Sequence, residues 1–275
     1  MSVSESSSSQ NIFRPGVTYD SHQLNEIAER YAEHYPDFIF NPISDSSATE
    51  RILAKREEWR TLGTTVVFTS GVYDLLHQDH KGYLLHTKLT GAAFHYQQHY
   101  AYGHSTWDDL TSEEKRVYSD TFIKNEELKL IVSVDGDNSV ANRKSGVETK
   151  ASSPRPITGW LTRASSVVDV TYPFRTANGW DRRPVADAVT AHGPEDFDAT
   201  SPHGSIINLA CALQPDVWAI YEESEDILSD APLVPALGAV ALSCIPIQEG
   251  ITYFSDSFLG RFSTTAILRR AKGEA

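Results

Sequence analysis

The chain contains 275 residues, of which 40% are hydrophobic and 22% are charged, and its formal net charge is −13. This composition is typical of a globular protein with one large or two small domains, and the acidic charge argues against a nucleic acid or an anionic membrane as the main partner. Two cysteines are too few for a disulfide framework, and no stretch reaches the roughly 18 apolar residues of a membrane span, so we expect a cytoplasmic location.

The first 63 residues are predicted to form a tail followed by a helical extension. The Ser-rich start, MSVSESSSSQ, lacks the basic and apolar regions of a signal peptide and is expected to be disordered. Helix signals cover residues 21–35, which end at Tyr35-Pro36, and residues 48–62, where Gly63 is expected as the C-terminal cap. We assign these helices to packing or homodimerisation, and no chemistry to them.

Residues 64–275 are predicted to form an α/β domain. Apolar, β-branched runs predict buried strands, and amphipathic segments predict helices between them. The expected strands are 64–69, 128–134, 216–221 and 240–247, with a further strand near 185–190. The expected helices are 79–89, 157–168, 205–213 and 263–272. This alternation predicts a Rossmann-like parallel sheet with helices on both faces.

Two segments interrupt the alternation and are interpreted as insertions, near residues 90–125 and 176–199. The first is rich in Tyr and His, and it carries a polar helix signal at 111–115. His95, His99 and His104 have a spacing at which histidines can chelate a metal, but no cysteine or clear carboxylate accompanies them. We therefore predict no metal site there, and expect both insertions to cover the mouth of the active site and to shape acceptor selectivity.

The strongest functional signal is the segment TSGVYDLLHQDH at 69–80, which directly follows the first predicted strand. In parallel α/β sheets, ligands bind at the carboxyl ends of the strands. Gly71 allows a sharp turn close to a ligand. His77 and His80 lie three residues apart at the start of a helix, where free N–H groups and the helix dipole attract anions. The segment therefore predicts a phosphate-binding site with two imidazole donors.

This segment resembles the G-x-F-D-x-x-H-x-G-H signature of the cytidylyltransferase-like nucleotidyltransferase superfamily, which is related to the class I aminoacyl-tRNA synthetases. Further segments resemble the other motifs of that superfamily, in the expected order. These are DGDNSV at 135–140 followed by RKSG at 143–146, RPI at 155–157 with Arg163 beyond it, ALQPDV at 212–217, and FSTTAI at 262–267. The pattern is most similar to heptose-phosphate adenylyltransferases, with glycerol-3-phosphate cytidylyltransferases as a second group.

The resemblance implies transfer of a nucleoside monophosphate from ATP or CTP, with Mg²⁺, to a small phosphorylated sugar or polyol, releasing pyrophosphate. It assigns site residues in three groups. The catalytic group is His77, His80 and Lys144; the nucleotide-binding group is Thr69, Ser70, Gly71, Tyr73, Asp79, Ser263, Thr264 and Thr265; the acceptor- or phosphate-binding group is Asp74 and Arg163. Simpler interpretations stay open for some of them: Lys144 as a solvated lysine, Arg163 as the partner of a surface acid, residues 263–265 as a plain helix cap, and Asp74 as a residue that fixes the turn.

The chain departs from the family pattern at three places. Asp79 stands where the signature has Gly, WAIYEE at 218–223 replaces a VKG stretch, and Gly260-Arg261 stands near the place of an R-T-x-G stretch. A carboxylate repels phosphate unless a metal intervenes, and the loss of VKG removes a basic residue. These departures motivate an alternative hypothesis, a catalytically degenerate protein that binds a nucleotide to regulate or scaffold a partner. A synthetase-like adenylate-forming enzyme is disfavoured because no KMSKS-type loop is present.

Overall fold

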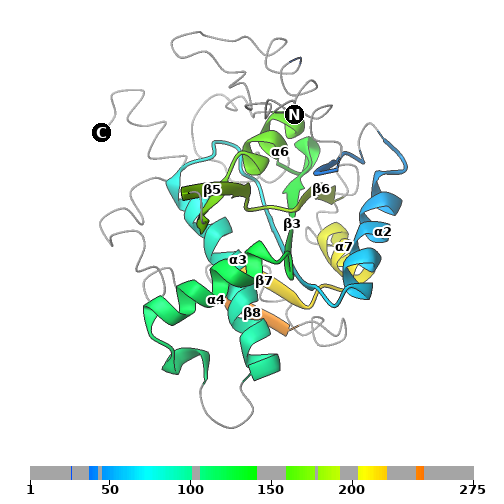
Figure 1. Cartoon of the computed structure of the whole chain (residues 1–275). Helices are drawn as coiled ribbons and strands as arrows, with labels where there is room; N and C mark the ends of the chain where they lie inside the picture. Colours follow the sequence, from blue (N-terminus) through cyan, green and yellow to red (C-terminus); the bar gives the residue numbers. More distant parts are fainter. Residues whose placement is uncertain are drawn as a thin grey trace, which may run out of the picture.

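The described part of the chain is built on one parallel β-sheet. The computed structural model describes residue 26 and residues 37–42, 45–100, 106–140, 159–176, 179–192, 204–221 and 240–244. Six strands pair in the order β1-β6-β3-β2-β7-β8, and each pairing is parallel. The predicted Rossmann-like α/β fold is therefore confirmed (Figure 1).

The strands of this sheet match most of the predicted strands. They are β2 (Thr65–Gly71), β3 (Leu128–Asp135), β6 (Ala188–His192), β7 (Val217–Tyr221) and β8 (Val240–Cys244). The edge strand β1 (Ile39–Phe40) was not predicted, and it brings the N-terminal extension into the sheet beside β6. Strand β2 lies between β3 and β7, where the strand order reverses its direction along the chain. In such folds this reversal opens a crevice at the carboxyl edge of the sheet.

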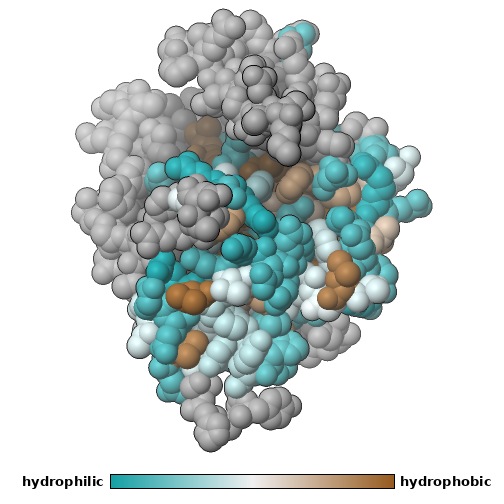
Figure 2. All heavy atoms as spheres, in the orientation of Figure 1, coloured by the Kyte–Doolittle hydropathy of each residue, from teal (hydrophilic) through white to brown (hydrophobic). Residues whose placement is uncertain are grey.

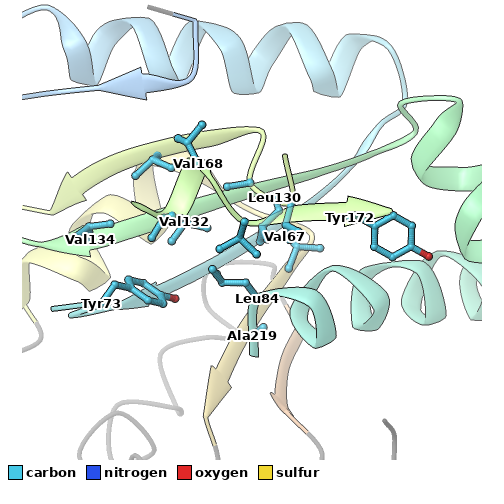
Figure 3. Packing of buried hydrophobic residues seen from close by; sticks show 14 of the residues in the cluster. Val67, Tyr73, Leu84, Leu130, Val132, Val134, Val168, Tyr172 and Ala219 are labelled. Carbon is cyan, nitrogen blue, oxygen red and sulfur yellow. The ribbon is translucent and has the colours of Figure 1, made fainter. Parts of the chain in front are cut away.

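Helices cover both faces of the sheet, as predicted. Helices α2 (Ala48–Thr61) and α7 (Gly204–Leu213) pack on one face, side by side at the right of Figure 1, against Phe68, Ile131 and Trp218. Helices α3 (Gln78–Tyr100), α4 (Ser112–Lys124) and α6 (Trp160–Val168) pack on the other face. Figure 3 shows this second core, in which Leu84 of α3 points toward Val67 of β2. Burial of alternate strand residues on the two faces thus accounts for both layers.

Helix α3 differs from its predicted range, because it continues to Tyr100 instead of ending near residue 89. The helix begins after the carboxyl end of β2, and Gly91 already lies against Val67 and Leu128 near the amino end of the sheet. Residues 92–100 therefore extend beyond the amino edge, followed by a 3₁₀ turn, η1 (Trp107–Asp109), and α4. The insertion near residues 90–125 was expected to cover the mouth of the active site at the carboxyl edge of the sheet. For its described residues this prediction is wrong, because they extend from the amino edge instead.

The second predicted insertion also contributes to the framework. An antiparallel hairpin, β4 (Thr171–Thr176) and β5 (Gly179–Pro184), leads into β6, which is a strand of the main sheet. The predicted strand near 185–190 is thus confirmed as β6, with its bounds moved by two to three residues. Residues 193–199, the predicted helix at 263–272 and most of the predicted helix at 21–35 lie outside the described residues.

Candidate functional site

The turn between β2 and α3 is compact and unusual in its backbone. Tyr73 has a positive φ of 50°, which is uncommon for a residue other than glycine. Its buried ring folds back toward Gly71, where an added Cβ would lie 3.0 Å from the ring atoms Cε2 and Cζ. Gly71 thus allows the Tyr73 ring to pack closely on the backbone, and the predicted site residues Gly71 and Tyr73 meet within one turn.

His77 and His80 are brought together, as the motif predicts. Their rings stack with centroids 3.8 Å apart at an angle of 22°, and the Tyr73 and His80 rings meet in a T-shaped arrangement with centroids 5.4 Å apart. His80 Nδ1 lies 3.2 Å from the Leu75 carbonyl. Since a carbonyl only accepts, this contact places a proton on Nδ1.

The electrostatics of this pair favour a neutral His77. Burial lowers its pKa from the usual 6.5, and the nearby Asp79 carboxylate opposes this shift. His77 Nδ1 is buried without a hydrogen-bond partner in the described part of the chain. A buried ring nitrogen without a partner is costly unless a ligand or water completes it. Asp79, which stands where the family signature has Gly, therefore lies beside the histidine pair in the first turn of α3.

Thr69 has a structural role that the motif did not predict. Its hydroxyl donates to the Ala219 carbonyl of β7 at 3.0 Å and lies 2.6 Å from the Tyr83 hydroxyl of α3. The side chain is fully buried, so it joins β2, β7 and α3 below the site. Ser70 and Gly71, which follow it, are partly exposed at the carboxyl edge and remain the accessible part of this strand end.

Arg163 of α6 lies at the same edge but in internal contacts. Its Nη1 donates to the Val72 carbonyl at 2.9 Å, and its Nη2 lies 2.6 Å from Asp137 Oδ1. This matches the simpler interpretation, that Arg163 pairs with an acid. Asp74 is also buried, in the turn between Val72 and His77.

A second polar cluster at the carboxyl edge was missed in the sequence. Ser133 Oγ lies 2.6 Å from His192 Nδ1, and His192 Nε2 lies 3.0 Å from Asp135 Oδ1. All three side chains are buried, so Ser133 is not placed to act as a nucleophile on an external substrate. The pairing depends on the β3–β6 register, in which Asp135 is opposite His192. No local motif reports that register, and residues 188–192 lay within a segment interpreted as an insertion.

Four predicted site residues lie outside the described residues, namely Lys144, Ser263, Thr264 and Thr265. The described carboxyl edge carries the acids Asp74, Asp79, Asp135 and Asp137 beside the two histidines and Arg163. Among the described residues, no group of three or more His, Cys, Asp or Glu side chains is arranged to hold a metal ion.

His95 and His99 of α3 form part of an aromatic cluster at the opposite end of the helix. His95 Nδ1 lies 2.6 Å from the Tyr118 hydroxyl, and its ring packs on Phe122 with centroids 3.9 Å apart. Burial, assisted by His99, lowers the pKa of His95 to about 4, and burial raises that of Tyr118 above its usual value. Both groups are therefore held in their neutral forms, joined by one short hydrogen bond. Over α3 and α4, Figure 2 shows separated hydrophobic spots rather than a continuous apolar surface.

A scan against protein-family models and a search of curated proteins both find no match for this chain. Within the residues that the structure describes, no helix combines the length and apolar character needed to cross a membrane.

Proposed function

We propose that this protein is a nucleotidyltransferase that moves a nucleoside monophosphate from a nucleoside triphosphate to a small phosphorylated sugar or polyol, releasing pyrophosphate, in the cytoplasm. One observation carries the proposal. The stacked His77–His80 pair lies at the start of α3, directly after β2, at the carboxyl edge where the strand order reverses. Backbone N–H groups, the helix dipole and two imidazoles at one point favour a polyphosphate.

The chemistry proposed for this site needs positioning more than acid–base catalysis. A phosphate oxygen of the acceptor attacks the α-phosphorus in line, and the bond to the leaving pyrophosphate breaks. Because the nucleophile is already anionic, no general base is required. His77 and His80 would hold the triphosphate and stabilise charge on the phosphoryl oxygens, together with Lys144 and with Ser263, Thr264 and Thr265. Mg²⁺, bound through the triphosphate, would neutralise part of its charge.

The hydrogen bond of His80 to the Leu75 carbonyl predicts a change in the protonation of His80 when the triphosphate binds. Because Nδ1 already donates to the Leu75 carbonyl, Nε2 can donate to a phosphate oxygen only in the imidazolium form. Triphosphate binding should therefore favour the protonated ring and take up a proton from solvent. In calorimetry, the apparent binding enthalpy would then depend on the ionisation enthalpy of the buffer.

The direct test is pyrophosphate release with ATP or CTP, Mg²⁺ and a panel of sugar and polyol phosphates. His80→Ala should lower kcat/KM roughly 10- to 150-fold, since a charged hydrogen bond contributes about 1.5–3 kcal/mol. His99→Ala, a matched change at the far end of α3, should leave kcat/KM within about twofold. Equal losses in the two variants, or no turnover with any triphosphate and acceptor, would contradict the proposal.

A second candidate function is a regulatory or scaffold protein that binds a nucleotide without turnover. The observation that favours it is Asp79, whose carboxylate lies in the first turn of α3 beside His77 and opposes phosphate binding electrostatically. Saturable nucleotide binding without pyrophosphate release would support this alternative, and Asp79→Gly should then tighten binding. Turnover by the unaltered protein would exclude it.

A further inference from the structure

Arg163 joins two loops that leave neighbouring strands at the carboxyl edge. The Val72 carbonyl belongs to the loop after β2, which leads to His77 and His80, and Asp137 begins a helical turn directly after β3. One guanidinium contacts both, at 2.9 and 2.6 Å. The side chain of Arg163 has 0% exposure, whereas Asp137 is 56% exposed.

Burial limits what this guanidinium can do. A buried charge is tolerated when it is paired and hydrogen-bonded, and Asp137 and the Val72 carbonyl supply such contacts here. A fully enclosed guanidinium has no surface to offer a substrate phosphate in this structure. Its planar fork instead suits a rigid link between two groups at a set spacing.

Helix α6 supplies a fixed base for this link. Trp160, one turn before Arg163, donates its indole Nε1–H to the Val134 carbonyl at 3.0 Å, near the end of β3. Both side chains are buried, and the helix packs against the core of the sheet. Trp160 and Arg163 of α6 thus hydrogen-bond to the end of β3 and to the loop that begins the histidine motif.

We propose that Arg163 is a positioning residue, which sets the loop at Val72 against the turn at Asp137 and thereby shapes the nucleotide site without touching the ligand. This inference rests on the proposed nucleotide-binding function of the β2–α3 turn. It differs from the family-derived expectation, in which Arg163 would contact a phosphate directly. The two roles predict opposite effects for the loss of Asp137.

The experiment measures the dissociation constant of Mg²⁺–ATP and Mg²⁺–CTP for Asp137→Ala, Arg163→Gln and the double variant. If Arg163 positions the loops, Asp137→Ala weakens binding in the same direction as Arg163→Gln, roughly two- to thirtyfold, and the double variant is no worse than the stronger single one. If Arg163 contacts phosphate, Asp137→Ala frees the guanidinium, removes a negative charge and tightens binding. Tighter binding, or additive losses, would overturn the proposal.

Controls separate this result from unfolding and from failure of the proposed function. Asp108→Ala removes one exposed acid at η1 and should leave the dissociation constant unchanged. Arg163→Lys keeps the charge and should restore part of the affinity, and all constants are measured well below each unfolding midpoint. If the unaltered protein binds neither nucleotide, the proposed function fails and this inference with it. If it binds and Asp137→Ala tightens binding, this inference alone fails.

Discussion

The two ends of α3 carry similar histidine pairs in contrasting surroundings. His77 and His80 stack at the start of the helix with ring centroids 3.8 Å apart, and His95 and His99 lie near its end with centroids 4.2 Å apart. The first pair lies at the carboxyl edge of the sheet, beside backbone turns and the positive end of the helix dipole. The second lies beyond the amino edge, among tyrosine and phenylalanine rings. The comparison teaches that histidine pairs on one helix can lie in unlike surroundings, and that position relative to the sheet is what favours the first pair as the proposed phosphate site.

The largest expected effect is on the free energy of unfolding, and it concerns an ion pair that attaches the middle of α3 to the sheet. Buried Lys88 donates from Nζ to Asp187 Oδ2 and to the Val185 carbonyl, both at 2.8 Å, and Asp187 also accepts from the Leu130 N–H. Asp187→Ala should lower the free energy of unfolding by about 3–5 kcal/mol, because it leaves a buried ammonium without its carboxylate. Denaturant unfolding at pH 7.5 measures this.

The matched change at the other partner should cost less. In Lys88→Met, Asp187 keeps the Leu130 N–H and Lys129, whose Nζ lies 3.6 Å from Oδ1, and it is partly exposed. A larger loss for Lys88→Met than for Asp187→Ala would contradict the claim that the unpaired Lys88 ammonium is the main cost of breaking this ion pair.

The next effect concerns the close approach of α3 to the sheet. An added Cβ at Gly91 would overlap Val67 Cγ2 and come within 2.7 Å of Leu128 Cδ1. Gly91→Ala should therefore destabilise the fold by about 1–3 kcal/mol through overpacking. Gly82→Ala on the same helix meets nothing within 4 Å, and it should be neutral or stabilising by up to about 1 kcal/mol through helix propensity. If Gly91→Ala and Gly82→Ala shifted the unfolding midpoint in the same direction relative to the unaltered protein, the close packing at Gly91 would be contradicted.

The smallest expected effect is a pH dependence of the free energy of unfolding, which arises from His95 near the end of α3. His95 has a pKa of about 4 in the folded protein, against 6.5 for an ordinary histidine, so the unfolded chain binds the extra proton between these values. Its contribution to stability is present above pH 6.5 and is lost as the pH falls toward 4. After allowance for solvent exposure we expect about 1 kcal/mol.

The measurement compares unfolding midpoints at pH 7 and pH 4.5 for the unaltered protein, His95→Gln and His99→Gln. His95→Gln should reduce the difference between the two pH values, and His99→Gln should leave it close to that of the unaltered protein. A difference unaffected by His95→Gln would show that this ring is not buried as a neutral partner of Tyr118.

The alternating strands and helices were predictable because their signals are local. Runs such as TTVVFT at 64–69 and LKLIVSV at 128–134 are buried on both faces, and Gly71 with His77 and His80 occupies a contiguous turn. Residues 90–100 were harder, since the helix continues there through Tyr and His residues whose buried side is aromatic rather than aliphatic. Strand β6 is short and follows a hairpin rich in Arg and Asp.

The contacts that join distant segments could not be predicted from one sequence. Arg163 meets Val72 across 91 positions, and Ser133 meets His192 across 59. Both contacts depend on which strands are neighbours and on their register, which tertiary packing sets. The sequence could name Arg163 as a candidate only through its motif, and it gave His192 no signal.

The most direct test of the central claim follows the histidine ring signals by NMR, in protein labelled with ¹⁵N-histidine, as Mg²⁺–ATP or Mg²⁺–CTP is added. The account predicts saturable shifts for His77 and His80, with His80 moving toward the imidazolium form, while His95 and His99 stay unchanged. Saturable shifts confined to His95 and His99, or no shift at His77 and His80 at millimolar concentrations of either nucleotide, would contradict it.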